Sequence, residues 1–311
     1  MAPELIDRFR RDLETVAGRL PETLGVAVSG GPDSLALLLL ADAAMPGRIH
    51  AATVDHRLRP ESAAEASFVG ELCARLGVPH ATLCDADAPI EGGGVQAQAR
   101  ALRYRLLADW AAPLGWLATA HHLDDQAETL LMRMARGAGL SGLAGIRPRR
   151  ALGSAMLVRP LLGWRRGELE KLVAEAGLNA VDDPSNRSDA FDRTRARALL
   201  AERGDDLPAP RLAASASHLR EAEEALAWAA EREWRARVAE SEGALLLDPE
   251  GLPPELLRRI ASRAIDTIRG ETDWRRDKLA AALAAGERVT LAGIMITPGP
   301  RWRFEPEPKR R

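Results

Sequence analysis

The sequence predicts an α/β protein, in which a doubly wound, mostly parallel sheet is followed by a smaller, mainly helical domain. Short apolar runs alternate with longer segments of helical periodicity along the first two-thirds of the chain, as in a parallel sheet covered on both faces. A glycine-rich turn joins the first apolar run to a helical segment. The length of 311 residues allows about two domains of ~150 residues each.

The elements of the first domain, expected to span 1–205, follow this alternation. An amphipathic helix is predicted over 4–20, because apolar side chains recur along one side. Strands are predicted at the apolar runs 25–28, 49–55, 80–84, 116–120 and 156–162. Helices are predicted directly after the glycine-rich turn and at 61–76, 95–110, 124–136, 168–176 and up to about residue 203. Glycines at 137, 139, 142 and 145 indicate a loosely built connection.

The second domain is expected to span 206–311. A polar segment with two prolines, 204–210, marks the boundary. Helices are predicted at 211–237 and 253–268. Alternating apolar residues on both sides of Pro298-Gly299 predict a C-terminal hairpin.

Composition indicates a soluble globular protein, with 46% apolar and 28% charged residues. The N-terminus is charged, and the longest apolar run, Leu35–Ala41, is far shorter than the ~20 residues of a membrane helix. We therefore expect a cytoplasmic protein without a membrane partner. Cys73 and Cys84 form no C-x-x-C pair, so neither a disulfide framework nor a zinc site is predicted.

The turn Ser29–Ser34 (SGGPDS) has the properties of a phosphate-binding loop. A strand, a glycine turn and a helix N-terminus present unpaired N–H groups and a positive dipole end to an anion. Gly30 and Gly31 allow a phosphate to approach, and Pro32 suits the first helical turn. Asp33 beside a phosphate indicates a Mg²⁺ ligand. The loop lacks the lysine of a Walker A motif and resembles that of the PP-loop ATP pyrophosphatases; the alternative is a turn without ligand.

Polar residues also follow two other predicted strands. In doubly wound sheets ligands bind beyond the carboxyl ends of the strands. We therefore expect Ser29–Ser34, Asp55-His56 and His121–Glu128 to converge at one edge of the sheet.

The densest group of ionisable residues lies at 120–129 (AHHLDDQAET). Asp125 and Glu128 are spaced i,i+3, and Asp124 and Glu128 i,i+4, so these carboxylates can share a helix face. Paired carboxylates favour a cation, either a metal or a substrate ammonium group, and one could accept a proton from an amine. Alternatively, the two aspartates only complement the helix N-terminus. Zinc is disfavoured, because adjacent histidines on a strand point in different directions.

Arginines are concentrated between 133 and 167, where no acidic residue occurs, although the net charge of the chain is only −2. Such a local positive field can dock a phosphate backbone. The alternatives are a solvated face or pairing with distant carboxylates. The arginines are Arg133, Arg136, Arg147, Arg149, Arg150, Arg159, Arg165 and Arg166.

Four segments together resemble the tRNA(Ile)-lysidine synthase family of PP-loop enzymes. They are SGGPDS at 29–34, DHRLRPES at 55–62, AHHLDDQAETLLMRMARGAGLSGLAGI at 120–146 and DDPSN at 182–186. The resemblance implies an enzyme that uses ATP and Mg²⁺ to join free L-lysine to C2 of the wobble cytidine of tRNA(Ile) with a CAU anticodon. An adenylated cytidine is the intermediate, AMP and pyrophosphate are released, and the codon read changes from AUG to AUA. A homodimer is left open.

The resemblance assigns roles to individual residues. It implies Asp33, Asp125 and Glu128 as catalytic residues, with Asp33 also the metal ligand, and Asp125, Glu128 and Arg193 around the lysine. ATP contacts are expected from Ser29, Gly30, Gly31, Pro32, Asp33, Ser34, Asp55, Arg100 and His121. Arg133, Arg136 and Arg197 are expected to contact tRNA, and the second domain is expected to bind tRNA through residues such as Arg232, Arg235, Arg237, Arg258 and Arg259. Threonine at 194, where relatives often have asparagine, leaves the register of Arg193 open.

Two other functions compete with this one. Another PP-loop tRNA-modifying enzyme, such as a base thiolase, would commonly use paired cysteines, which this chain lacks. A non-catalytic nucleotide-binding module would have no use for the acidic cluster at 120–129.

Overall fold

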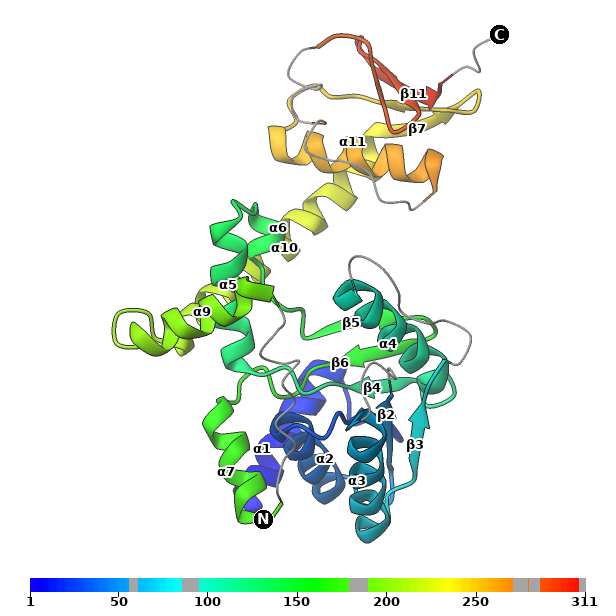
Figure 1. Ribbon diagram of the computed structural model, residues 1–311. Coiled ribbons are helices and arrows are strands. Elements are labelled where there is room, and N and C mark those ends of the chain that lie inside the picture. Colours follow the sequence, from blue (N-terminus) through cyan, green and yellow to red (C-terminus); the bar gives the residue numbers. More distant parts are fainter. Residues whose placement is uncertain (56–60, 86–94, 179–189, 271–278, 280–285, 308–311) are drawn as a thin grey trace. The chain divides into compact units, whose positions relative to one another are not determined.

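The computed structural model describes residues 1–55, 61–85, 95–178, 190–270, 279 and 286–307 (Figure 1). The chain divides into two compact units, Met1–Arg220 and Glu221–Arg311. The boundary therefore falls later than the one expected after residue 205, because the first turns of helix α10 (Ala209–Arg237) belong to the first unit. In the parts of the chain that the structure describes, no helix is long and apolar enough to cross a membrane.

The first unit is built on a six-stranded sheet in the order β3-β2-β1-β4-β6-β5. Its parallel strands are β1 (Leu24–Ala27), β2 (Ile49–Val54), β3 (His80–Leu83), β4 (Trp116–Ala118) and β6 (Ala155–Val158). The edge strand β5 (Arg149–Leu152) runs antiparallel to β6. The predicted mostly parallel sheet is confirmed, although β5 was not predicted and β6 ends before residue 159.

Side chains on the two faces of this sheet enter two different cores, as the two-residue period of a strand requires. Leu24 and Val26 of β1 pack in the cluster that contains Phe9 of α1 (Pro3–Ala17) and Leu37 of α2 (Pro32–Ala44). Leu117 of β4 faces the opposite way and packs with residues of α4 (Val95–Ala111). The other helices of the unit are α3 (Glu61–Leu76), α5 (Leu123–Ala135), α6 (Leu140–Leu143), α7 (Arg166–Glu175) and α9 (Ala190–Glu202).

The second unit contains more strand than the sequence predicted. Its five-stranded antiparallel sheet has the order β7-β8-β11-β10-β9. Helix α11 (Pro254–Arg269) buries Ile260 and Ile265 with Leu247 and Phe304 of the sheet. The predicted hairpin is present as β10 (Ile294–Thr297) and β11 (Trp302–Pro306). The five-stranded sheet is completed by β7 (Val238–Ser241), β8 (Ala244–Leu247) and β9 (Val289–Leu291).

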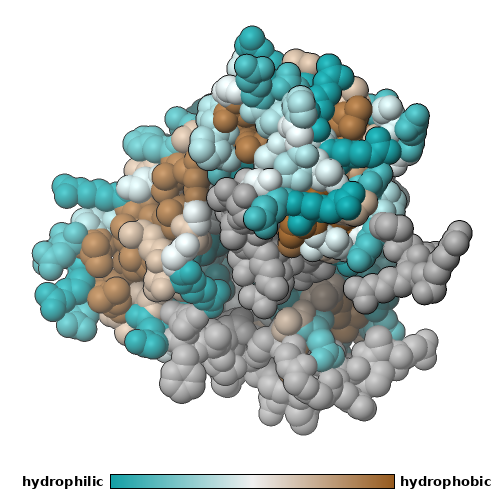
Figure 2. Space-filling view, turned by 90° about the horizontal axis from the view of Figure 1, so that it is seen from above, coloured by the Kyte–Doolittle hydropathy of each residue, from teal (hydrophilic) through white to brown (hydrophobic). Residues whose placement is uncertain are grey.

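Some large apolar side chains stay at the surface, and Figure 2 shows apolar patches between hydrophilic side chains. Met134 of α5 and Leu199 of α9 are 54% and 41% exposed. On α10, Trp228 is 66% exposed and lies beneath the guanidinium of Arg232, 5.6 Å from it.

The strand order brings the predicted site segments to one edge. Strands β2, β1 and β4 are parallel neighbours, with Leu24 beside Ile49 and Gly25 beside Leu117. The segments that follow them therefore leave the sheet at the same end. Asp55 follows β2 directly, Ser29 follows β1, and His121 follows β4. His56 lies outside the described residues.

Candidate active site

The loop Ser29–Ser34 is folded around the hydroxyl of Ser34. That oxygen accepts a hydrogen bond from the N–H of Ser29 at 3.1 Å and donates to the carbonyl of Gly31 at 2.9 Å. Gly30 has a φ of +86°, in the left-handed region that favours glycine. Pro32 opens α2, as predicted. The loop thus leads directly into the N-terminus of a 13-residue helix, the end that attracts anions.

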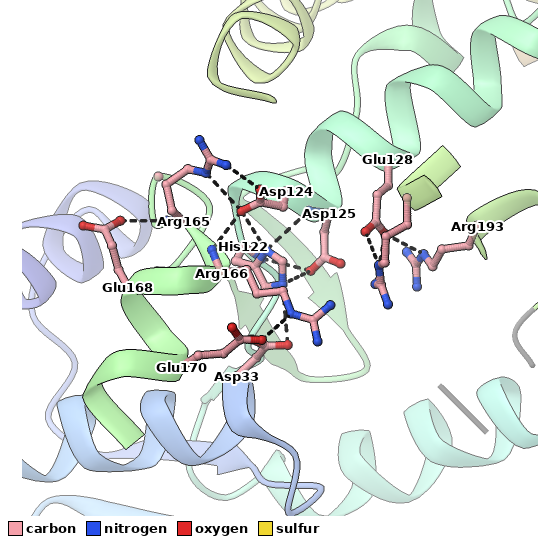
Figure 3. A network of polar contacts seen from close by, with 12 residues as sticks. Asp33, His122, Asp124, Asp125, Glu128, Arg165, Arg166, Glu168, Glu170 and Arg193 are labelled. Atoms are coloured by element: carbon pink, nitrogen blue, oxygen red, sulfur yellow. Dashed lines mark hydrogen bonds and ion pairs between the residues drawn. The ribbon is translucent and has the colours of Figure 1, made fainter. Parts of the chain in front are cut away.

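Three side chains meet next to this loop (Figure 3). Nε2 of His122 lies 3.5 Å from Oδ2 of Asp33 and 3.6 Å from Oδ2 of Asp125. The loop after β1 and the start of α5 are therefore joined at a buried histidine, which is 2% exposed. The predicted convergence of the two acidic segments is present in the structure.

His122 is also the N-cap of α5. Its N–H donates to Oδ2 of Asp125 at 3.0 Å, and its ring accepts from the N–H of Asp125 at 3.4 Å, which completes a capping box. Burial lowers the pKa of His122, but the carboxylates of Asp33, Asp125 and Asp124 outweigh burial and hold the pKa above its ordinary value. The surrounding acids therefore favour the protonated form of this histidine over the neutral one more than water would.

Asp125 is the ionised carboxylate of this group. Burial alone would raise its pKa, yet His122, the backbone N–H of His122 and Arg193 hold the pKa below its usual range. An ionised, buried carboxylate can bind an ammonium group or accept its proton.

The neighbouring Asp124 has a different, structural function. Its Oδ2 accepts from the N–H of Arg166 at 2.8 Å, and its Oδ1 lies 3.1 Å from the guanidinium of Arg165. Asp124 thereby joins α5 to the first turn of α7, as Figure 3 shows. The sequence left open that both aspartates only complement the N-terminus of their own helix; Asp125 does take part in that cap, whereas Asp124 binds the start of a different helix, α7.

Glu128 lies one turn further along α5 and is bound by two arginines of α9. Its Oε1 accepts from Nε of Arg197 at 2.8 Å, and its Oε2 lies 3.4 Å from Nε of Arg193. The carboxylate is 2% exposed, and Nε of Arg193 is buried without a hydrogen-bond partner in the described chain. A lysine ammonium that approaches Glu128 must therefore share it with these guanidinium groups. Arg197, expected at the tRNA, lies beside the expected lysine-binding Arg193.

Several arginines of the acid-free stretch face protein groups. Arg133 donates to the carbonyls of Gly142 and Gly145, at 2.5 and 3.0 Å. Arg159 is 4% exposed, and so is not part of an RNA-binding surface. Arg136 remains exposed and has an interaction of its own. The alternative of pairing with a distant carboxylate is thus correct for Arg165, which pairs with Asp124, whereas Arg133 and Arg159 bind backbone carbonyls and Arg166 pairs with the nearby Glu170.

The sequence did not predict that Arg159, Arg150 and Tyr104 gather near His121 and Arg100. Arg159 contacts His121, and both Arg100 and Arg150 stack over the ring of Tyr104, at 5.1 and 4.6 Å. Arg100 was predicted as an ATP contact, and its charge is near enough to lower the pKa of His121. The signal that could have indicated Arg159 is its position directly after a strand. The sequence does not show that it is buried, so it looks the same as the exposed arginines near it. The DDPSN segment lies outside the described residues.

A divalent cation has one candidate ligand in this group. Oδ1 of Asp33 is buried and has no hydrogen-bond partner among the described residues. No cluster of three His, Cys, Asp or Glu ligands occurs in that part of the chain either. Mg²⁺ is commonly held by one or two carboxylates together with substrate phosphates, so a single aspartate beside a phosphate-binding loop fits it.

The side chain of Gln126 explains why position 145, in the connection after α5, is a glycine. Its amide donates to the carbonyl of Ile146 at 2.9 Å and accepts from the N–H of Ile146 at 2.6 Å. Gly145 has a φ of +70°, and a Cβ there would overlap Oε1 of Gln126. The connection is therefore fixed to α5 rather than loosely built.

We expect Gly145→Ala to lower the free energy of unfolding by about 1–3 kcal/mol more than Gly137→Ala. Gly137 is the matched control, because it has a similar φ of +67° but nothing within 4 Å of an added Cβ. The difference between the two variants isolates the overlap from backbone strain. Urea unfolding measures it, and equal losses would show that Gln126 does not constrain this position.

Comparisons with known proteins first identify the class of protein to which the chain belongs. A family model described as the PP-loop domain matches residues 5–203. A solved structure of the U34-tRNA thiolase NcsA from Methanococcus maripaludis, with its 4Fe-4S cluster, shares the fold. Its TM-score is 0.58 at 17% identity, over 71% of this chain and 78% of that one. The first unit is a PP-loop domain, as predicted.

Two curated relatives define the family. A tRNA(Ile)-lysidine synthase of Zymomonas mobilis is 46% identical over 99% of this chain and 96% of its own length. A tRNA(Ile)-lysidine synthase of Novosphingobium aromaticivorans is 46% identical over 98% of this chain and 94% of its own. The chain belongs to the tRNA(Ile)-lysidine synthase family, and the resemblance found in the sequence is confirmed.

Proposed function

We propose that this chain joins L-lysine to C2 of the wobble cytidine in a tRNA(Ile) with a CAU anticodon, using ATP. Its family makes it an ATP-dependent ligase that modifies tRNA. The observation that carries the detailed proposal is the meeting of Asp33 with Asp125 through His122. A group beside the phosphate-binding loop and a group suited to an amine are thereby held in one site.

In the first step, O2 of the cytidine attacks the α-phosphorus of ATP. A bond forms between that oxygen and phosphorus, and the bond to the β-phosphate oxygen breaks, which releases pyrophosphate. The N-terminus of α2 and the loop amides would hold the phosphates, and His121 would donate to them. A Mg²⁺ ion held by Asp33 would neutralise charge on the leaving pyrophosphate.

In the second step, the ε-amine of lysine attacks C2 and AMP leaves with the oxygen. The amine is protonated in water, so it must lose a proton before it can attack. The ionised Asp125 would bind the ammonium, and it is the carboxylate we propose as the acceptor of that proton. Glu128 and its two arginines would form the far wall of the lysine site.

The test is incubation with ATP, Mg²⁺, [¹⁴C]lysine and an unmodified tRNA(Ile) transcript. We expect lysine label in the RNA with equimolar AMP and pyrophosphate. A transcript with uridine at the wobble position is the matched control and should stay unlabelled. No label in the CAU transcript, or pyrophosphate release without RNA, would contradict the proposal.

The two cysteines distinguish the proposed ligase from a base thiolase. Cys73 is buried and Cys84 exposed, and burial, with the charge of Asp42, raises the pKa of the Cys73 thiol to about 11. A thiol with such a pKa is a poor nucleophile. We expect the Cys73→Ala/Cys84→Ala variant to keep lysine transfer within about twofold, because the proposed steps use no thiol. Loss of transfer in a folded variant, or sulfur-dependent modification by the wild type, would favour the thiolase.

A further inference from the structure

Arg159 is a buried cation that the proposed reaction does not use. It follows β6 directly and is 4% exposed. Its N–H donates to the carbonyl of Pro148 at 2.8 Å, and its Nη1 donates to the carbonyl of Arg147 at 2.5 Å. Its guanidinium also lies near enough to Tyr104 for the two groups to influence each other's pKa. Hydrogen bonds therefore fix both the backbone and the side chain of Arg159, whereas an arginine at the surface is usually held by fewer contacts.

The remaining contact of Arg159 reaches the site. Its Nε lies 3.4 Å from Nδ1 of His121 in donor geometry. A guanidinium has only donors, so the histidine nitrogen that faces it must be an acceptor. The hydroxyl of Thr119 lies 3.1 Å from the same Nδ1, and a hydroxyl can donate to it. Two donors thus converge on one ring nitrogen.

This geometry decides the tautomer of His121. With Nδ1 as acceptor, the proton of a neutral imidazole must sit on Nε2. Burial and the charges of Arg159, Arg100 and Arg193, opposed by Asp125, lower the pKa of His121 to about 3, so the ring stays neutral near pH 7. Within the described residues Nε2 makes no hydrogen bond to the protein. Its N–H is available to a ligand.

We propose that Arg159 is a positioning residue which, with Thr119, holds His121 as its Nε2–H tautomer, so that His121 is a neutral donor to an oxygen of the bound nucleotide. This rests on the proposed use of ATP, because the ligand class is a phosphate ester. A neutral donor suits a site already crowded with acids and arginines, since it stabilises a phosphate oxygen without adding a titrating charge.

The two adjacent histidines then have opposite functions. His122 lies among Asp33, Asp124 and Asp125, while Nδ1 of His121 faces Arg159. The change of side follows from their adjacency at the end of a strand, where neighbouring side chains point in different directions. One histidine organises the carboxylates, and the other donates to the nucleotide.

The first test requires no turnover. We expect ¹⁵N spectra of the wild type near neutral pH to show His121 with an unprotonated Nδ1 and a protonated Nε2, assigned by comparison with His121→Gln. Saturating ATP should shift the Nε2 resonance. In Arg159→Met the protonated Nδ1 form should appear, whereas the exposed Arg149→Met is the matched control and should leave the spectrum unchanged. A protonated Nδ1 in the wild type, an unchanged tautomer in Arg159→Met, or an Nε2 that ignores ATP would overturn the proposal.

The second test is a double-mutant cycle on pyrophosphate release. The amide nitrogen of glutamine can replace the Nε2–H donor without needing Arg159. We therefore expect Arg159→Met to lower the rate about tenfold or more in the wild-type background, but less than twofold in His121→Gln. Equal losses in both backgrounds, with unchanged urea unfolding, would mean that Arg159 acts independently of His121. Failure of the proposed function differs, because the wild type itself would then transfer no lysine to the CAU transcript.

Discussion

Asp33→Ala is expected to lower pyrophosphate release from ATP by about a thousandfold or more. Asp33 stands in the first turn of α2, beside the phosphate-binding loop, and its Oδ1 is buried with no partner in the described chain. Among the described residues, removing it takes away the one buried carboxylate oxygen that has no partner beside the phosphate-binding loop. The measurement is pyrophosphate release with ATP, Mg²⁺ and transcript, in the absence of lysine.

Asp42→Asn is the matched control for this prediction. Asp42 lies on the same helix as Asp33 but near its other end. We expect it to keep pyrophosphate release within about twofold, because its carboxylate is remote from the loop. If Asp33→Ala released pyrophosphate at a rate near that of Asp42→Asn, Asp33 would have no part in adenylation.

Glu128→Gln is expected to impair lysine transfer by about a hundredfold while leaving pyrophosphate release within about threefold. The glutamine keeps the shape of the side chain but removes the charge that a lysine ammonium would use. It also leaves Arg193 and Arg197 beside a neutral group. Because these arginines are partly exposed, we expect only about 1–3 kcal/mol of lost unfolding free energy, less than for a fully buried pair.

Arg197→Gln separates two explanations of that result. If Glu128 acts on lysine directly, Arg197→Gln should lose less lysine transfer than Glu128→Gln, since the carboxylate remains. If Glu128 acts only by holding α9, the two variants should lose transfer to the same extent. Equal loss of pyrophosphate release in Glu128→Gln and Asp33→Ala would contradict the division of labour between the two acids.

The fold of the first unit could be predicted because its sequence signals are local. The apolar content of β1, the glycines of the loop and the apolar length of α2 all indicate the same arrangement. The edge strand β5 was missed because its sequence, RRAL, lacks alternating apolar residues and is held by pairing with β6. In the second unit, β7 directly follows the 29-residue helix α10, with no glycine or proline to separate them.

The members of the site could be predicted, but not their partners. Spacing placed Asp125 and Glu128 on one helix, and parallel strand order brought Asp33 to them. Nothing in the sequence indicates that Asp124 accepts a hydrogen bond from the backbone of Arg166, about forty positions away. Such pairings depend on how α7 and α9 pack on α5, which no local pattern encodes.

The second unit gives a similar lesson for arginines expected at RNA phosphates. Arg259 pairs with Glu223 and Glu255, and Arg258 with Glu255. Acids three and four positions away are favourable partners on a helix, and Arg235 and Arg237 use them too. Binding of tRNA by this unit remains a prediction, and these arginines would have to leave or share an acid to make it.

The first two turns of α5 have a consequence for variants elsewhere in the first unit. From its N-cap onward, the side chains at positions 122, 124, 126 and 128 are attached to the first turn of α2, to α7, to the backbone at Ile146 and to α9. A substitution in any of these four segments therefore shifts the same few carboxylates. We expect pairs of such substitutions to show strong epistasis in activity, even where the two side chains are far from each other. Tolerance to mutation should accordingly be low also in the first turn of α7 and around Ile146, although neither is proposed to contact a substrate.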